Sequence, residues 1–283
     1  MQNTDIMEKK GSDFMELYHY CSVAVMQSII ENKFLRLSSA IETNDKTEYK
    51  YFEKALEEYA GTTKTESVLI KNAVKEVVRQ ATSVKREKYR PYICCLSKEK
   101  DLLSQWRGYG DDGRGVAIRF DFEKTGQFVR KSNMNKIETA PFITEIEYAE
   151  TERIKSVPIV FHNMLSYVAV ANPTYEETYK LGVWQAAVAS ISLKHFGFLE
   201  EQEYRIVWLD NGENHPDVKE EFCTRNGELK KCFRFKLDVK NAVKEIILGP
   251  KCKMKKDDPE FVSFLESNNL QDVKISESSI PYC

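Results

Sequence analysis

Long apolar runs are absent from this sequence of 283 residues. A helix that spans a membrane needs about 20 consecutive apolar residues, and no such stretch occurs. The opening segment, residues 1–13, is polar and lacks the apolar core of a signal peptide. We therefore expect a cytoplasmic protein without membrane contact, in which residues 1–13 form a polar N-terminal tail.

An excess of positive charge is also absent. The sequence has 42 Lys and Arg residues against 44 Asp and Glu residues, and its formal net charge is −2. No overall basic field exists that would hold nucleic acid or an anionic membrane. A phosphate-bearing ligand must therefore be bound through local contacts.

The common metal-binding and catalytic motifs are missing. The seven cysteines are odd in number and form no C-x-x-C pair, which excludes the usual disulfide framework and zinc knuckle. H-E-x-x-H, G-x-S-x-G and G-x-x-x-x-G-K-[ST] do not occur, and Gly113-x-Gly115 is too short for a dinucleotide-binding fingerprint. We predict no metal site, and we interpret the cysteines as reduced packing residues.

Apolar material, in contrast, is plentiful. Hydrophobic residues make up 42% of the chain and aromatic residues 11%, which suffices for a full core. At roughly 150 residues per domain, this length fits one large domain or two modest ones. Because no repeat or obvious linker divides the sequence, we expect a single domain over residues 1–283.

The first half of the chain alternates strand and helix patterns. Ser22 is placed to cap a helix that ends near Lys33, and Asn44 or Asp45 is placed to start the next one. An amphipathic surface helix is expected from Thr65 to Lys88. Glycines between residues 108 and 113 mark a turn where the backbone can approach a ligand closely. Strands are expected at residues 16–20, 34–37, 92–97 and 115–120.

The second half begins with a helical pattern from Pro158 to Phe196. Thr174 and Glu177 form a capping box and Gly197 is the expected stop, so we interpret residues 158–197 as a helical insertion. Strands are expected at residues 204–209, 231–237, 243–248 and 273–276, and a helix at residues 258–266. The sequence thus predicts an α+β protein with one mixed or split β core and helical decorations.

The sharpest chemical feature is the stretch Glu201-Gln202-Glu203-Tyr204-Arg205. In a strand, residues two apart share a face, so Glu201, Glu203 and Arg205 project together. Surface ion pairs on a solvent-facing strand account for this pattern equally well. The alternative is a cleft in which two carboxylates and a guanidinium converge.

Further polar and aromatic residues fit a nucleotide site. His19 lies in a strand, on the face opposite to Tyr18 and Tyr20, where a structural role is the ordinary explanation. Trp106, Arg107 and Tyr109 flank the glycine-rich turn and offer a stacking surface and a cation. A magnesium-dependent phosphodiesterase built on Glu201, Glu203 and His19 is a further possibility.

Together these segments resemble a bacterial family of proteins of unknown function, number 2971 in its series. The resemblance extends over nearly the whole chain. It departs from the family pattern at Lys46, where proline is expected. The segments that carry it are Tyr18-His19-Tyr20, Asn44-Asp45-Lys46-Thr47-Glu48, Trp106-Arg107-Gly108-Tyr109, Gly115 to Phe120, Glu201 to Arg205 and Ile280-Pro281-Tyr282.

The order of the motifs also resembles that of ADP-ribosyltransferases, whose split β core binds NAD. This resemblance implies that Glu203 stabilises the positive charge that develops when the nicotinamide–ribose bond breaks, and that Glu201 orients or deprotonates the acceptor. It assigns hydrogen bonds with the ribose or the nicotinamide amide to His19 and Ser97, and stacking to Tyr109 or Trp106. The pyrophosphate is assigned to Arg107 or Arg205, with the alternative that Arg205 only fixes Glu203 by a same-face ion pair. The implied cofactor site comprises His19, Tyr20, Ser97, Trp106, Arg107, Tyr109 and Arg205.

The expected function is therefore NAD-dependent ADP-ribosyl transfer or NAD hydrolysis, in a toxin or defence effector by resemblance alone. The sequence leaves the acceptor open: protein, nucleic acid, small molecule or water. The sequence also leaves open whether Asn44, Asp45 and Glu48 serve the site, because a helix cap explains them without such a role. Two alternatives stay open besides the phosphodiesterase. One is a non-catalytic module that binds a nucleotide or a partner protein; the other is an RNA 2′-phosphotransferase-like reaction, which requires a basic track at residues 85–90, 230–231 or 251–256.

Overall fold

The chain opens with the predicted order of strand, helix, strand, helix. These elements are β1 (Leu17–Cys21), α1 (Val23–Asn32), β2 (Phe34–Ser39) and α2 (Glu48–Thr62). Ser22 caps α1 as predicted, because its hydroxyl accepts a hydrogen bond from the Val25 amide at 3.2 Å. Lys33 ends α1 in the left-handed conformation, with φ of 55°.

The structure, a computed structural model, describes residues 16–42, 48–62, 89–122, 129–130, 139–150, 153–155, 157–162, 175–225 and 227–282, with a few isolated positions between them. The predicted N-terminal tail, most of the helix predicted from Thr65 to Lys88, and Asn44, Asp45 and Lys46 lie outside these residues. Thr174, the first residue of the predicted capping box, also lies outside them.

A large mixed sheet of 11 strands, mostly antiparallel, forms the centre of this α+β fold. Its main path runs β10-β11-β2-β3-β1-β4-β12-β13, while β9 pairs with β3 and β6, and β5 pairs with β6. The strands not yet introduced are β3 (Arg90–Ser97), β4 (Val116–Phe120), β5 (Val129–Arg130), β6 (Phe142–Glu145), β9 (Glu203–Asp210), β10 (Val218–Arg225), β11 (Glu228–Lys236), β12 (Val243–Leu248) and β13 (Lys274–Glu277). A separate small parallel sheet pairs β7 (Glu147–Ala149) with β8 (Leu193–His195).

The sheet forks at β3. One edge of β3 pairs with β9 along the whole strand, from Arg90 to Ser97. The other edge is shared, because β2 pairs with it at Tyr92 and Ile93 whereas β1 pairs with it only at Ser97. Between these contacts, residues 94–96 have no ladder partner on that edge among the described strands. The fork therefore leaves a short stretch of β3 backbone for side chains to cover.

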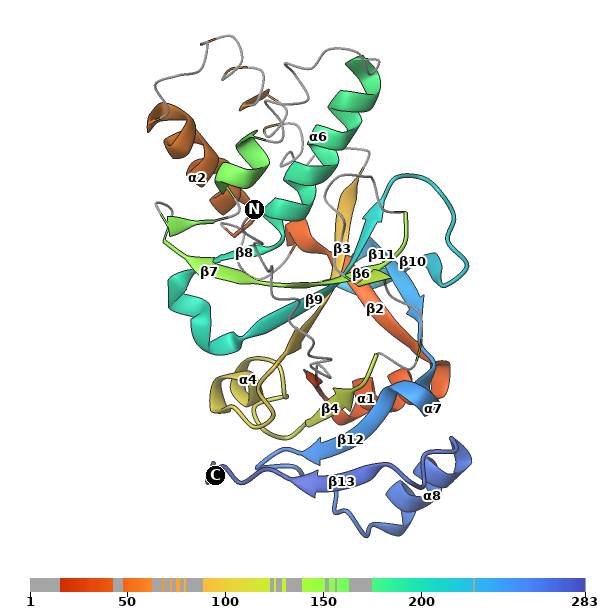
Figure 1. Cartoon of the computed structure of the whole chain (residues 1–283). Coiled ribbons are helices and arrows are strands. Elements are labelled where there is room, and N and C mark those ends of the chain that lie inside the picture. Colours follow the sequence, from red (N-terminus) through yellow and green to blue (C-terminus); the bar gives the residue numbers. More distant parts are fainter. Residues whose placement is uncertain are drawn as a thin grey trace, which may run out of the picture.

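Two cores lie on opposite faces of the β3–β9 pair. Tyr92 and Leu96 face the core that includes α1 and α8 (Pro259–Ser267), whereas Ile93 and Val207 face the core that includes α2 and α6 (Tyr175–Ser190). Figure 1 shows α2 and α6 above the sheet, with α1 and α8 at the lower end. The short helices are α4 (Leu103–Gly108), α7 (Val239–Ala242) and the 3-10 segments η1 (Ala40–Glu42) and η4 (Phe196–Glu201).

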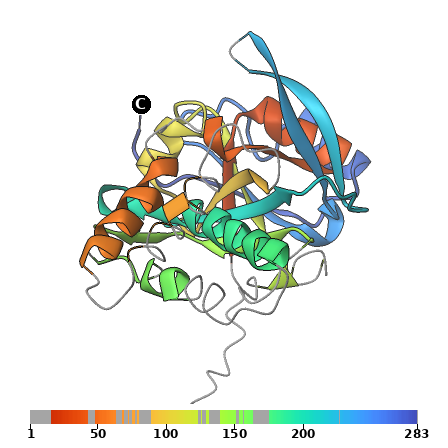
Figure 2. The same cartoon turned by 90° about the horizontal axis from the view of Figure 1, so that it is seen from above.

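The strands β10 and β11 form a ribbon that leaves the main body. Only residues 232–236 of β11 pair with β2, so that the rest of the ribbon is two-stranded. In Figure 2 this ribbon, drawn in blue, projects from the molecule. Its outer strand β10 was absent from the sequence prediction, because its sequence VKEEFCTR has no regular alternation of apolar and polar residues.

The helix predicted from Pro158 to Phe196 is wrong in its last part. Helix α6 ends at Ser190, and β8 and η4 follow where the helix was expected to continue. The hydroxyls of Ser190 and Ser192 donate to the Ala187 and Val188 carbonyls at 2.8 Å each. At this end, side chains therefore bond carbonyls of the last helical turn, an alternative to continuing the helix. Gly197 therefore does not stop a helix; its amide donates to the Nδ1 of His195 at 3.0 Å.

No helix within the described ranges is long and apolar enough to cross a membrane.

Candidate functional site

A cavity of about 550 Å³ opens at the fork of the sheet. Its walls come from β1, β2, β3, α4, β8, η4, β9 and the end of β10, segments that are far apart in the sequence. Seven of the nine residues that the sequence analysis assigned to the site line it: His19, Tyr20, Ser97, Tyr109, Glu201, Glu203 and Arg205. The volume is typical of a pocket for a small molecule.

His19 covers the exposed β3 backbone at the fork. Its Nδ1 lies 3.0 Å from the carbonyl oxygen of Cys95, in the stretch that neither β1 nor β2 pairs. A carbonyl can only accept, so Nδ1 carries the proton and Nε2 is the ring nitrogen with a free lone pair. Burial lowers the pKa of His19, although the bond to Cys95 acts in the opposite direction. His19 therefore lines the cavity as a neutral imidazole.

Glu203 is an ionised carboxylate enclosed by cations. Arg205 donates from Nε and Nη2 to its two oxygens, at 2.7 and 3.1 Å, and the Nζ of Lys194 lies 2.6 Å from Oε2. Burial alone raises the pKa of Glu203, but Arg205, helped by Lys194, outweighs it and holds this pKa at about 2. The charge is therefore fixed in place and largely neutralised.

Lys194 joins the two carboxylates of the Glu-x-Glu stretch. Its Nζ lies 2.6 Å from Oε2 of Glu201 and 2.6 Å from Oε2 of Glu203. The side chain of Glu201 is 15% exposed, against 5% for Glu203, so Glu201 is the more open of the two. The ammonium of Lys194 thus contacts both carboxylates. Within the described part of the chain, no group of three or more His, Cys, Asp or Glu residues is arranged to hold a metal ion.

Two hydroxyls fix the backbone of the Glu-x-Glu stretch. The Ser97 hydroxyl donates to the Glu201 carbonyl at 2.8 Å and accepts from the Glu99 amide at 3.0 Å. The Tyr148 hydroxyl, from β7, accepts from the Glu203 amide at 2.8 Å. Gln202 between them has a left-handed φ of 40°, which turns the chain from η4 into β9. Ser97 is thus engaged by the protein itself and positions Glu201.

Aromatic rings line the cavity. Tyr109 is 44% exposed and lines it, as does Phe198, over whose ring the Nζ of Lys194 lies 5.5 Å from the centroid. Burial and the neighbouring Glu201 raise the pKa of Tyr109 to about 12, so the phenol stays neutral. Tyr20 is buried; its hydroxyl donates to the Glu99 carbonyl at 2.8 Å. Tyr109 therefore offers the stacking surface that Tyr20 lacks.

Cys95 presents a thiol to the cavity. It lies on β3 opposite Arg205 of β9, and its side chain is exposed to the cavity space. Burial raises the pKa of this thiol well above its ordinary value, and the negative charge of Glu203 raises it further. The thiol is therefore accessible but protonated, and it is a weak nucleophile.

A family model covers the middle of the chain. Residues 105–206 match the model described as Protein of unknown function (DUF2971). This stretch runs from α4 into β9, so it contains Tyr109, Lys194, Glu201 and Glu203, and it excludes His19. The resemblance noted over nearly the whole sequence is thus matched over this stretch.

No curated protein and no solved structure matches the chain. The similarity to ADP-ribosyltransferases in motif order therefore stays a prediction from the sequence.

Trp106 and Arg107 do not line the cavity. Trp106 is 0% exposed, and its indole nitrogen donates to Asp101 Oδ1 at 2.7 Å, so it has no surface on which a ligand ring could stack. Arg107 is exposed, and its guanidinium lies 5.1 Å from the centre of the Tyr282 ring instead. Arg205 lines the cavity but is buried, and it is bound to Glu203 and to the Ile191 carbonyl at 2.9 Å.

Several lining residues escaped the sequence analysis. Lys194 was hidden because it fell inside the helix predicted to reach Phe196. Cys95 had a usable signal, since it is two residues before Ser97 on a predicted strand and therefore shares its face. Arg36 on β2 and Arg225 on β10 also line the cavity, and no motif marked them.

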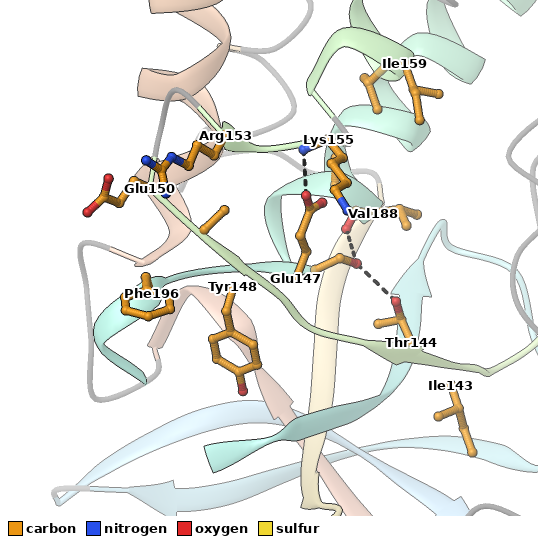
Figure 3. A pocket seen from close by; sticks show the side chains of 14 residues that line it. Ile143, Thr144, Glu147, Tyr148, Glu150, Arg153, Lys155, Ile159, Val188 and Phe196 are labelled. Carbon is orange, nitrogen blue, oxygen red and sulfur yellow. Dashed lines mark hydrogen bonds between the residues drawn. The ribbon is translucent and has the colours of Figure 1, made fainter. Parts of the chain in front are cut away.

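A second cavity, of about 730 Å³, is lined by residues of β6, β7 and the end of α6. In Figure 3 the Glu147 side chain points into it, toward the Lys155 backbone, whereas the Tyr148 ring points the opposite way. Tyr148 is nevertheless one of the residues that border this second cavity, while its hydroxyl accepts a hydrogen bond from the Glu203 amide at the first. Tyr148 thus forms part of the wall between the two cavities.

Proposed function

We propose that the protein cleaves the nicotinamide–ribose bond of NAD and transfers the ADP-ribosyl group to an acceptor or to water. The observation that carries this proposal is the convergence on one cavity of His19, from β1, with Glu201 and Glu203, from the end of η4 and the start of β9. Breaking this bond develops positive charge on the ribose ring. Fixed negative charge in an enclosed site lowers the free energy of that transition state.

The contacts of the two carboxylates support different roles for them. Glu203 is saturated by Arg205 and Lys194, so it has little charge left for a ligand. Glu201 is more open, and its ion pair is with Lys194, which it shares with Glu203. We therefore propose that Glu201 faces the reacting ribose carbon. Glu203 is then a positioning residue, which holds Lys194 and through it Glu201.

His19 and Tyr109 supply the binding contacts in this proposal. The lone pair of Nε2 on neutral His19 accepts a hydrogen bond from a ribose hydroxyl. The exposed ring of Tyr109 stacks on the nicotinamide. The departing nicotinamide takes the electron pair of the broken bond, and the acceptor nucleophile bonds to the ribose carbon and gives up its proton.

One of the three basic segments proposed for an RNA reaction, residues 230–231, forms ion pairs with carboxylates. Lys230 lies 2.6 Å from Glu228, and Lys231 lies 2.8 Å from Asp210. These ion pairs reduce the charge available to an RNA backbone. The non-catalytic alternative uses the same cavity, and it predicts nucleotide binding without turnover.

The test is incubation of the purified protein with NAD, followed by measurement of released nicotinamide. We expect release by the wild-type chain and its loss in Glu201→Gln, with ADP-ribose still bound. The neighbouring residue Glu200 is exposed and outside the cavity, so Glu200→Gln is the matched control and keeps full activity. Binding of NAD with no nicotinamide release by the wild-type chain would establish the non-catalytic alternative. Full release by Glu201→Gln would remove Glu201 from the mechanism.

A further inference from the structure

The charges that line the cavity at the fork do not cancel. Two carboxylates, Glu201 and Glu203, face four cationic side chains, and His19 is neutral. The cations are Arg36, Lys194, Arg205 and Arg225. Lys194 and Arg205 form ion pairs with the two carboxylates. The excess positive charge among the lining residues therefore lies with Arg36 and Arg225, on the side of the cavity formed by β2 and the ribbon.

Arg225 is available to a ligand. It lies in register with Glu228 of β11, but the Glu228 carboxylate is bound by Lys230 at 2.6 Å. Arg225 has no ion pair or side-chain hydrogen bond with any residue that the structure describes. Its side chain is half-buried and lines the cavity. A half-buried guanidinium beside a cavity interacts more strongly with an anion than one in open solvent.

Arg36 is only partly neutralised. Its Nε lies 3.3 Å from Oε1 of Glu221, but this carboxylate also accepts from Arg234. One carboxylate is thus shared by two guanidiniums. The Arg36 side chain is 49% exposed, so it has donors left for a further anion.

We propose that Arg36 and Arg225 bind the diphosphate bridge of a dinucleotide or nucleoside diphosphate at the ribbon side of this cavity. This proposal rests on the proposed function, because it places the anionic part of the same ligand whose ribose lies at Glu201. In a dinucleotide each phosphate of the bridge carries one negative charge at neutral pH, so each guanidinium can meet one phosphate. The planar guanidinium donates two parallel hydrogen bonds to phosphate oxygens.

The ribbon is therefore part of the ligand site in this proposal. Arg225 is the last residue of β10, close to the turn of the ribbon that Figure 2 shows projecting from the body. In this proposal Arg36 and Arg225 take the role of binding the pyrophosphate that the sequence suggested for Arg107 or Arg205. Arg205 is buried, and Arg107 lies outside the cavity.

The experiment titrates inorganic pyrophosphate and ADP-ribose into the full chain by calorimetry. We expect each of Arg225→Gln and Arg36→Gln to weaken both ligands by about tenfold or more, the value typical of a lost charge-assisted hydrogen bond. Arg107→Gln, an exposed arginine outside the cavity, is the control and should bind both ligands like the wild type. Circular dichroism of each variant verifies the fold.

The outcomes separate this proposal from the proposed function. Unchanged affinity for both ligands in Arg225→Gln and Arg36→Gln overturns the diphosphate subsite, even if NAD is consumed. Binding of pyrophosphate that depends on both arginines, without any nicotinamide release, supports the subsite and contradicts the NAD reaction. If NAD is cleaved, Arg225→Gln raises KM more than it lowers kcat, because it is remote from the broken bond.

Discussion

Replacing Glu203 by glutamine should destabilise the protein strongly at neutral pH. Burial raises the pKa of Glu203, but the bonds to Arg205 and Lys194 outweigh it and bring this pKa from an ordinary 4.5 to about 2. At about 1.4 kcal/mol per pKa unit, this shift corresponds to roughly 3 kcal/mol of stability at pH 7. Removing one partner of a buried ion pair typically costs about 3–5 kcal/mol of stability, which agrees with the value from the pKa shift.

The sign of the pH dependence follows from the direction of the shift. In the unfolded chain Glu203 takes up a proton below pH 4.5, while in the folded protein it stays ionised down to a pH of about 2. Its stabilisation is therefore complete above pH 4.5 and is lost as the pH falls toward 2. The difference in unfolding free energy between wild type and Glu203→Gln should shrink by about 1.4 kcal/mol between pH 7 and pH 3.5.

Urea unfolding monitored by tryptophan fluorescence measures this difference, because Trp106, Trp184 and Trp208 are all buried. Glu266→Gln changes an exposed carboxylate on α8 and is the control, with a stability within about 0.5 kcal/mol of the wild type. A loss below about 1 kcal/mol at pH 7 for Glu203→Gln would refute the account of a buried, tightly paired carboxylate. A difference that does not change with pH would refute it as well.

Three further predictions concern the same cavity. Because burial lowers the pKa of His19 below its ordinary 6.5, the rate of NAD cleavage should stay constant as the pH falls through 6.5 and decline only below it, as a pH–rate profile will record. Because the pKa of the Cys95 thiol is raised, its alkylation at pH 8, followed by mass spectrometry, should be slower than that of glutathione and slower still with ADP-ribose bound. Ser97→Ala removes the hydroxyl that donates to the Glu201 carbonyl, so Glu201 is held less firmly and kcat should fall more than KM changes. The free energy of unfolding in urea should fall by about 1–2 kcal/mol.

Each of these three has a defined control. A rate that is already half-maximal at or above pH 6.5 would contradict the neutral His19. Cys95→Ser identifies the labelled peptide, and alkylation as fast as that of glutathione would show an ordinary thiol. Ser97→Thr keeps the hydroxyl and should restore most of the activity; an equally inactive Ser97→Thr would argue against the bond to Glu201.

The sequence predicted the elements that have a strong local signal. The Ser22 cap and the start of α8 after Asp258 depend on side chains next to the helix itself, and both lie where expected. Helix α6 ended early because Leu193, which follows it, is buried as part of β8. That choice depends on pairing with β7, a segment far away in the sequence.

The site shows the same division. Spacing placed Glu203 and Arg205 on one face, and the structure brings them into contact at 2.7 Å. Spacing did not show that Lys194 reaches the same carboxylate, because the contact comes from another strand. Trp106 was predicted to be a stacking residue from its position in a glycine-rich loop. Its burial depends on Asp101 and on the Tyr20 ring, whose centroid lies 4.8 Å away.

The fork in the sheet separates where a ligand binds from how it is recognised. The hollow exists because β1 and β2 diverge over three residues of β3, and this divergence follows from strand order and register rather than from any single side chain. Part of the lining, such as Leu96, also packs in a core, whereas Arg36, Glu201 and Arg225 line the cavity and belong to none of the apolar cores. The same architecture can accordingly host other reactions, and directed evolution of its specificity can begin at these positions while the frame stays untouched.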